Sequence, residues 1–297
     1  MRGICKTYLI ATLLSLFLDI CMAQQQVKTI DVYLLAGQSN ATGQGYVVNM
    51  DSSMKVNKNV MIFHSGSPHL HTGFPSFTWL PLHPSSESPD RFGPELGLGS
   101  RLMELCPKSN IAIIKHAHSG TDLYEQWNPG KNALDSTDWG VQYKVFVKTV
   151  EDGLDKLSKQ GYIPVIRGML WQQGENDADM RRPISKDYAK NLKHFIARVR
   201  MQFQVPDLLF VYGYVYPPPN KGRGIQDVRR AQRNVSEKAH TKWSVPNAFV
   251  IFTDDLSLRA DDRNTRYPLD RLHFGTKGTW DLGVRMAEEI AKQNGLH

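Results

Sequence analysis

The chain has 297 residues, of which 41% are hydrophobic and 22% charged, and its formal net charge is +7 at pH 7. This composition excludes general disorder, a collagen-like repeat and a low-complexity array, and the length suits one large α/β domain. The basic residues are spread along the chain and form no stripe with interleaved aromatics, so we expect no nucleic-acid partner.

The first 23 residues predict a secretory signal peptide. Arg2 and Lys6 provide a positive start, an apolar run follows over 8–18, and Ala23 offers a small residue for cleavage. The run is too short to span a bilayer comfortably, so we expect no stable membrane partner; an uncleaved hydrophobic anchor is the alternative. The sequence therefore predicts a secreted or periplasmic protein whose domain covers residues 24–297.

Beyond this leader, apolar runs bounded by turn residues alternate with segments of helical periodicity. Taken in chain order, the pattern predicts strand 29–36, strand 59–63, helix 95–105, strand 111–114, helix 143–159, strand 164–170, helix 185–203, strand 208–215, helix 227–239, strand 248–252 and helix 277–293. The stretch 65–91, rich in Pro, Ser, His and Gly, predicts a long irregular loop. Strands that alternate with helices indicate an α/β fold with a doubly wound parallel sheet and helices on both faces. Ligands in such folds bind at the carboxyl ends of the strands.

The group Gly37-Gln38-Ser39-Asn40 directly follows the first predicted strand. A serine that leaves a strand and enters a helix is well placed as a nucleophile, because free N–H groups at the helix N-terminus can stabilise an oxyanion. Gly37 permits the sharp turn that exposes the hydroxyl. An ordinary helix-capping serine is the structural alternative. If Ser39 is the nucleophile, we expect Gln38 and Asn40 to contact the substrate.

A second group, Asp270-Arg271-Leu272-His273-Phe274, stands just before the last predicted helix. A serine hydroxyl is a weak nucleophile until a base takes its proton, and histidine has a suitable pKa for that role. A carboxylate three residues earlier can reach the other imidazole nitrogen and set its tautomer. The pattern therefore predicts His273 as general base and Asp270 as its orienting carboxylate, with an exposed loop aspartate and a helix-capping histidine as the alternative.

A third group, Trp171-Gln172-Gln173-Gly174-Glu175-Asn176-Asp177, follows the predicted strand 164–170. Gln173 could donate an amide N–H to an oxyanion, and Glu175 could position the histidine or hydrogen-bond the serine loop. The alternative is a carboxylate cluster favoured by the start of a helix.

A fourth group, His118-Ser119-Gly120-Thr121-Asp122, follows the predicted strand 111–114. The backbone N–H of Gly120 could complete an oxyanion hole, although a plain turn is the alternative. We expect His118 to contact the substrate, with a structural role as the alternative, and Trp127 to offer an apolar face to a sugar ring.

These blocks, in this order, resemble the SGNH hydrolase superfamily, and more narrowly carbohydrate esterase family 6 and the sialate O-acetylesterase domain. Phe92-Gly93-Pro94-Glu95 and Val228-Arg229-Arg230-Ala231-Gln232 are similar to weaker signatures of the same group. The resemblance implies a three-layer α/β/α, flavodoxin-like fold and hydrolysis of acetyl esters on polysaccharides such as xylan. It also implies an oxyanion hole built from the Ser39 N–H, the Gly120 N–H and the Gln173 side chain. Ser119-Gly120 stands where a Gly-Gly pair is more common in that group.

The sequence as a whole predicts a serine esterase that deacetylates a carbohydrate through an acetyl-enzyme intermediate, with acetylated xylan or a related plant polysaccharide as substrate. A sialate O-acetylesterase is the nearest alternative, and a non-catalytic carbohydrate-binding protein on an esterase scaffold is the alternative of another class. We expect no cofactor and no metal; the pair His69-x-His71 lacks the pattern of a third ligand. Whether Asp270 or Glu175 orients the histidine stays open at this point, as does the oligomeric state.

Overall fold

A seven-stranded sheet forms the centre of the computed structural model, which describes residues 28–66, 75–215 and 222–295. The strand order is β4-β3-β6-β1-β7-β8-β9; β4 pairs with β3 antiparallel, and the other pairings in this sheet are parallel. The predicted signal peptide lies outside the described residues. The strands of the sheet are β1 (Lys28–Gly37), β3 (Met61–His64), β4 (Leu80–Pro81), β6 (Ile111–Ala117), β7 (Tyr162–Gln172), β8 (Leu209–Gly213) and β9 (Ala248–Ile251).

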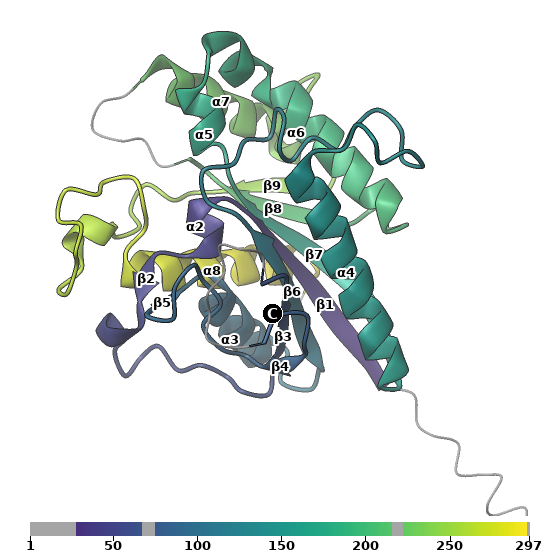
Figure 1. Cartoon of the computed structure of the whole chain (residues 1–297), viewed down its shortest axis with the longest axis vertical. Helices are drawn as coiled ribbons and strands as arrows, with labels where there is room; N and C mark the ends of the chain where they lie inside the picture. The colour runs from purple at the N-terminus through teal and green to yellow at the C-terminus, as the bar shows by residue number, and fades with distance from the viewer. Residues whose placement is uncertain (1–27, 67–74, 216–221, 296–297) are drawn as a thin grey trace, which may run out of the picture.

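Helices cover both faces of this sheet (Figure 1). They are α2 (Ser39–Thr42), α3 (Glu95–Leu105), α4 (Val141–Lys159), α5 (Glu175–Asp179), α6 (Arg182–Gln202), α7 (Arg223–Val235) and α8 (Thr276–Gln293). A separate two-stranded ribbon joins β2 (Gly45–Tyr46) to β5 (Arg91–Phe92), and single 3-10 turns occur at η1 (Val47–Asn49), η2 (Glu237–Ala239) and η3 (Arg259–Asp261).

Alternating side chains of β1 divide the apolar core into two clusters. Val32 and Leu34 pack with residues of α4, α6 and α7, whereas Tyr33 and Leu35 pack with residues of α3 and α8. The division follows from strand geometry, because successive side chains point to opposite faces of a sheet. Both faces of β1 are therefore buried, which is why its sequence is a continuous apolar run. The predicted three-layer α/β/α fold is confirmed.

The chain order of the strands places a crevice at the end of β1. After β1 the chain builds β3 and β6 on one side of it, then crosses to the other side to build β7, β8 and β9. The central order β6-β1-β7-β8-β9 is that of flavodoxin-like sheets, in which ligands bind where the direction of winding reverses. The turn after Gly37 lies at this reversal point.

The predicted elements all exist, and the differences concern their ends. The helix predicted over 227–239 begins earlier, at Arg223, and is broken at Ser236, whose φ of −58° and ψ of 137° leave the helical region. The stretch predicted as an irregular loop contains the short strands β4 and β5. The strand that starts at Ile111 continues to Ala117, so its polar end, including the buried His116, belongs to the sheet.

Candidate active site

Three strands end at the same level beneath the candidate site. Gly37 at the end of β1 pairs with Ala117 of β6 on one side and with Gln172 of β7 on the other. The segments that follow these strands line a pocket of about 390 Å³ together with the loop before α8. The pocket therefore lies at the carboxyl edge of the sheet, where the topology favours ligand binding.

The turn between β1 and α2 presents Ser39 to this pocket. Gly37 has a φ of +141°, and a Cβ built there would lie 2.1 Å from the carbonyl oxygen of Gln172, so the position admits glycine alone without strain. The N–H of Gln38 donates to that same carbonyl at 2.9 Å, which pins the turn against β7. Ser39 is the first residue of the short helix α2, as expected for a residue that leaves a strand and enters a helix.

Ser39, His273 and Asp270 form a continuous hydrogen-bonded chain. Nε2 of His273 lies 3.0 Å from Oγ of Ser39, and Nδ1 lies 2.8 Å from Oδ2 of Asp270. The other oxygen of Asp270 accepts from the backbone N–H groups of Leu272 and His273, each at 3.1 Å. Burial raises the pKa of Asp270, but its hydrogen bond to His273 and the charge of that residue outweigh burial and leave the pKa at about 2. The carboxylate is therefore charged throughout the neutral range.

Glu175 occupies a different place from Asp270. Its Oε1 accepts from Nδ2 of Asn40 at 2.8 Å, while Oδ1 of Asn40 accepts from the backbone N–H of Phe274 at 3.0 Å. Asn40 thus connects α2 to α5 and to the loop that carries His273, and Glu175 supports this connection without a hydrogen bond to His273. Burial raises the pKa of Glu175. The expectation that Asn40 contacts the substrate was wrong, because its buried amide serves this internal network.

Gln173 does not reach the pocket. It is fully buried, and its amide nitrogen donates to Oδ2 of Asp177 at 2.6 Å and to the carbonyl of Thr121 at 3.0 Å. An amide nitrogen carries two hydrogens, and these acceptors use both. The predicted role of Gln173 as an oxyanion donor does not fit this arrangement.

Gly120 and Ser39 present the backbone donors that an oxyanion hole requires. Both residues line the pocket, and Gly120 has open space around its Cα. No acceptor in the described part of the chain pairs with the backbone N–H of either residue. The two N–H groups are therefore available to a negatively charged oxygen in the pocket.

Two predicted substrate contacts lie elsewhere. Trp127 is fully buried and packs edge-to-face on Trp171 with ring centroids 5.0 Å apart, while its indole N–H donates to Oγ1 of Thr121 at 2.8 Å. The prediction of a sugar-facing Trp127 was wrong, because the ring fills the core between the sheet and α6. His118 is half-buried at the end of β6 and does not line the pocket.

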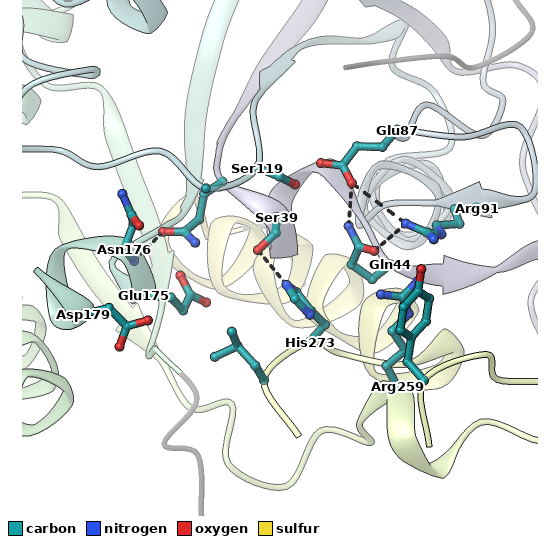
Figure 2. A pocket seen from close by; sticks show the side chains of 14 residues that line it. Ser39, Gln44, Glu87, Arg91, Ser119, Glu175, Asn176, Asp179, Arg259 and His273 are labelled. Carbon is teal, nitrogen blue, oxygen red and sulfur yellow. Dashed lines mark hydrogen bonds and ion pairs between the residues drawn. The ribbon is translucent and has the colours of Figure 1, made fainter. Parts of the chain in front are cut away.

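One wall of the pocket was not predicted from the sequence. Figure 2 shows Gln44, Glu87, Arg91 and Arg259 on one side of the Ser39–His273 pair, with Glu175, Asn176 and Asp179 on the other. Nη1 of Arg91 donates to Oε1 of Gln44 at 2.8 Å, and the guanidinium of Arg259 lies 3.8 Å from the centroid of the Tyr267 ring. Arg91 directly precedes the weak family signature 92–95, and that position is the sequence signal that could have identified it as a pocket residue. Arg259 stands in a turn with no distinctive pattern.

Asp177 anchors the loop that carries Gly120. Its carboxylate accepts from the backbone N–H groups of Leu123 at 2.8 Å and Tyr124 at 3.2 Å, as well as from Gln173. Burial raises the pKa of Asp177 from 3.8 to about 7, despite the opposing effect of these donors. Asp177 is therefore protonated in the folded protein over a pH range in which it is ionised in the unfolded chain.

This shift predicts a pH dependence of stability. Between pH 3.8 and about 7 the folded state holds a proton that the unfolded state has lost, so the free energy of unfolding should fall as pH rises through this window. The contribution of Asp177 is on the order of 4 kcal/mol across the window. In denaturant unfolding at pH 4 to 8, the free energy of unfolding should fall less steeply with rising pH for Asp177→Asn than for the wild type. Parallel curves for the two proteins would contradict the shift.

The described residues contain no group of three or more His, Cys, Asp or Glu side chains arranged to hold a metal ion. His69 and His71 lie outside the described residues. Within the described part of the chain, no helix is long and apolar enough to cross a membrane.

Comparisons with known proteins give this geometry a context. A family model described as carbohydrate esterase, sialic acid-specific acetylesterase matches residues 29–292. A solved protein from Arabidopsis thaliana is similar over 89% of this chain and 98% of its own, with 19% identity and a TM-score of 0.66. The structure of NanS is similar over 91% of this chain and 99% of its own, with 16% identity and a TM-score of 0.65. A carbohydrate acetylesterase from Xanthomonas citri is similar over 89% of this chain and 56% of its own, with 16% identity and a TM-score of 0.55. A comparison with curated protein sequences finds no match.

Proposed function

The chain belongs to the carbohydrate esterases described as sialic acid-specific acetylesterases, which are carboxylic ester hydrolases of O-acetylated carbohydrates, and on that premise we propose that Ser39, His273 and Asp270 carry out the reaction. The observation that supports these roles most strongly is the hydrogen-bonded chain from Ser39 Oγ through His273 to Asp270. Membership of an enzyme family favours catalysis over a purely carbohydrate-binding role. We also propose that the chain belongs to carbohydrate esterase family 6, which its sequence blocks resemble.

The proposed reaction is acyl transfer in two steps. Nε2 of His273 takes the proton of Ser39 as Oγ attacks the acetyl carbonyl, and Asp270 holds the imidazole in the tautomer that permits this. The N–H groups of Ser39 and Gly120 stabilise the negative oxygen of the tetrahedral intermediate. The sugar alcohol leaves with the proton from His273. Water, activated by the same base, then releases acetate from the acetyl-enzyme.

For the substrate, we propose acetylated xylan or a related plant polysaccharide, supported by the sequence blocks that resemble carbohydrate esterase family 6. The signal-peptide pattern over 1–23 supports an exported enzyme, secreted or periplasmic, that would meet such polymers. The pocket opens at the carboxyl edge of the sheet and has the volume of a small-molecule site, about 390 Å³.

A second candidate substrate is an O-acetylated sialic acid, and a specific observation favours it. Arg91 and Arg259 both line the pocket, and sialic acid carries a carboxylate that a guanidinium can bind. The description of the matching family supports the same candidate.

Kinetics on a substrate panel, combined with one variant, would decide between these candidates. We expect kcat/KM to be measurable on acetylated xylan, O-acetylated sialic acids and a simple aryl acetate. It should be highest on whichever of the two carbohydrate esters is the natural substrate. If a sugar carboxylate binds Arg91, Arg91→Gln should lower kcat/KM on sialic acid acetates by about tenfold to a hundredfold, since a charge-assisted hydrogen bond contributes about 1.5–3 kcal/mol. Activity on the aryl acetate should change little. An equal loss on all three substrates would contradict the carboxylate contact.

A further inference from the structure

Arg259 places a fixed positive charge against the carboxylate that orients His273. Its Nη1 donates to Oδ2 of Asp270 at 3.4 Å, and Oδ2 is the same oxygen that lies 2.8 Å from Nδ1 of His273. Among the described residues, Asp270 is the only carboxylate within ion-pair distance of Arg259. One carboxylate therefore serves two groups, an arginine that is always charged and a histidine whose charge changes during the proposed reaction.

The side chain of Arg259 is held in place from several directions. Only 4% of the residue is exposed, Nη2 donates to the hydroxyl of Tyr46 at 3.0 Å, and the guanidinium lies 3.8 Å from the centroid of the Tyr267 ring. The backbone is fixed as well, because the N–H of Arg259 donates to the carbonyl of His273 at 2.8 Å. Water and salt screen a charge at this depth only weakly, so the guanidinium acts strongly on its neighbours.

Other charged groups approach the pair from separate elements. Arg91 of β5 lies on the same side of the pocket, with its guanidinium 5.9 Å from the centroid of the Tyr267 ring (Figure 2). Glu175 of α5 lies on the opposite side, and burial raises its pKa, which favours its uncharged form. Burial also raises the pKa of Asp262, whose carboxylate accepts from the N–H of Thr276. The remaining charged groups of the pocket and its rim are Glu87, Asp179 and the pair Arg271–Asp261.

We propose that Arg259 is a positioning residue that acts on His273 through Asp270, and that its charge extends the activity of the enzyme to lower pH. This inference rests on the proposed acyl transfer at Ser39. The base must be uncharged to take the proton of Ser39. Protonation of the imidazole would leave Asp270 between two positive charges, so the guanidinium opposes it. Nε2 of His273 therefore stays ready to accept a proton at a pH where the same site without Arg259 would hold a charged imidazole.

The test is Arg259→Gln, which removes the charge but keeps an amide donor. The measurement is kcat/KM from about pH 5 to pH 9 on a simple aryl acetate, a substrate without a carboxylate that Arg259 could bind. Without the guanidinium the imidazole holds its proton up to a higher pH, so the acid limb of the profile should move up by about half a pH unit to one pH unit. The ratio of variant to wild-type kcat/KM should then be about threefold to tenfold lower at the acid end than above neutral pH.

Three further variants separate this charge from its surroundings. Arg259→Lys keeps a positive charge at the same place and should restore the wild-type acid limb, even if its different shape lowers kcat at every pH. Arg271→Gln removes one positive charge from the same loop, but Arg271 pairs with the exposed Asp261 at 2.7 Å, so the limb should stay where it is. If thermal unfolding shows that Arg259→Gln does not fold, Arg259→Met fills the space beside Tyr46 and Tyr267 without a charge and gives the same comparison.

The outcomes distinguish this inference from the proposed function. If the uncharged variant lowers kcat/KM by the same factor at every pH, Arg259 has a purely structural role and the inference fails. It also fails if Arg259→Lys or Arg271→Gln moves the acid limb as far as Arg259→Gln does. In each of these cases the roles of Ser39 and His273 stand, because the aryl acetate is still hydrolysed. If the wild-type protein hydrolyses no acetyl ester at all, the proposed function fails and the inference fails with it.

Discussion

Replacing Ser39 with alanine should lower kcat for acetate release by about a millionfold, the scale of loss when the nucleophile of a serine hydrolase is removed. The reason is that no acetyl-enzyme can form, so the stepwise reaction has no covalent intermediate. The measurement is acetate release from acetylated xylan, O-acetylated sialic acid and a chromogenic acetate. Covalent labelling with a serine-directed organophosphonate, followed by mass spectrometry, should modify the wild type and leave Ser39→Ala unmodified.

Ser119→Ala is the matched control for this experiment. Ser119 lines the same pocket, but its hydroxyl pairs with Oγ1 of Thr42 at 3.3 Å and not with a histidine. Without a base to take its proton it should not act as a nucleophile, so the variant should keep most of its activity and its organophosphonate label. Retention of activity in Ser39→Ala, or labelling at another residue, would overturn the assignment of the nucleophile.

Asp270→Asn should lower kcat by about ten-thousandfold with little change in fold. The oxygen of an asparagine would stay with the backbone N–H groups of Leu272 and His273, which can only donate. Its NH₂ would then face Nδ1 of His273, which must become an acceptor. The imidazole proton is thereby moved to Nε2, the nitrogen that has to take the proton from Ser39.

Glu175→Gln is the comparison that makes this prediction discriminating. A glutamine keeps an oxygen for Nδ2 of Asn40 and introduces no new partner for His273, so kcat should fall far less than in Asp270→Asn. Steady-state kinetics on one aryl acetate, with thermal unfolding of both variants, would measure the difference. Near-full activity in Asp270→Asn beside an inactive Glu175→Gln would reverse the two roles.

Much of the fold follows from local patterns in the sequence. The apolar run before Gly37 is continuous because β1 is covered on both faces, and the spacing of the helices reflects burial along one side. The alternation of strands and helices was enough to predict a parallel sheet, and hence that Ser39 and His273 would meet at its carboxyl edge. The structure brings these two side chains to 3.0 Å across 234 positions of sequence.

The choice among neighbouring polar side chains was decided by the tertiary structure alone. Gln38 and Gln173 are both plausible donors by residue type, and which one faces the pocket depends on acceptors and donors such as Asp177, Thr121 and the N–H of Gly174. Thr121 comes from the loop after β6, whereas Gly174 and Asp177 come from the loop and helix after β7, so no pattern within one segment records the whole set.

The same reason separates Asp270 from Glu175, and it accounts for what the sequence missed. A short turn places Asp270 against His273, a local relation that spacing predicts, whereas Glu175 meets Asn40 across 135 positions. Trp127 is of a residue type that often stacks on sugar rings, but here it packs against Trp171 in the core. By itself, therefore, the sequence determined the layered fold and the proposed nucleophile and base, because periodicity and short spacings record them. The tertiary structure decided which amide, carboxylate and aromatic side chains reach the pocket, because that depends on packing and hydrogen bonding between distant segments.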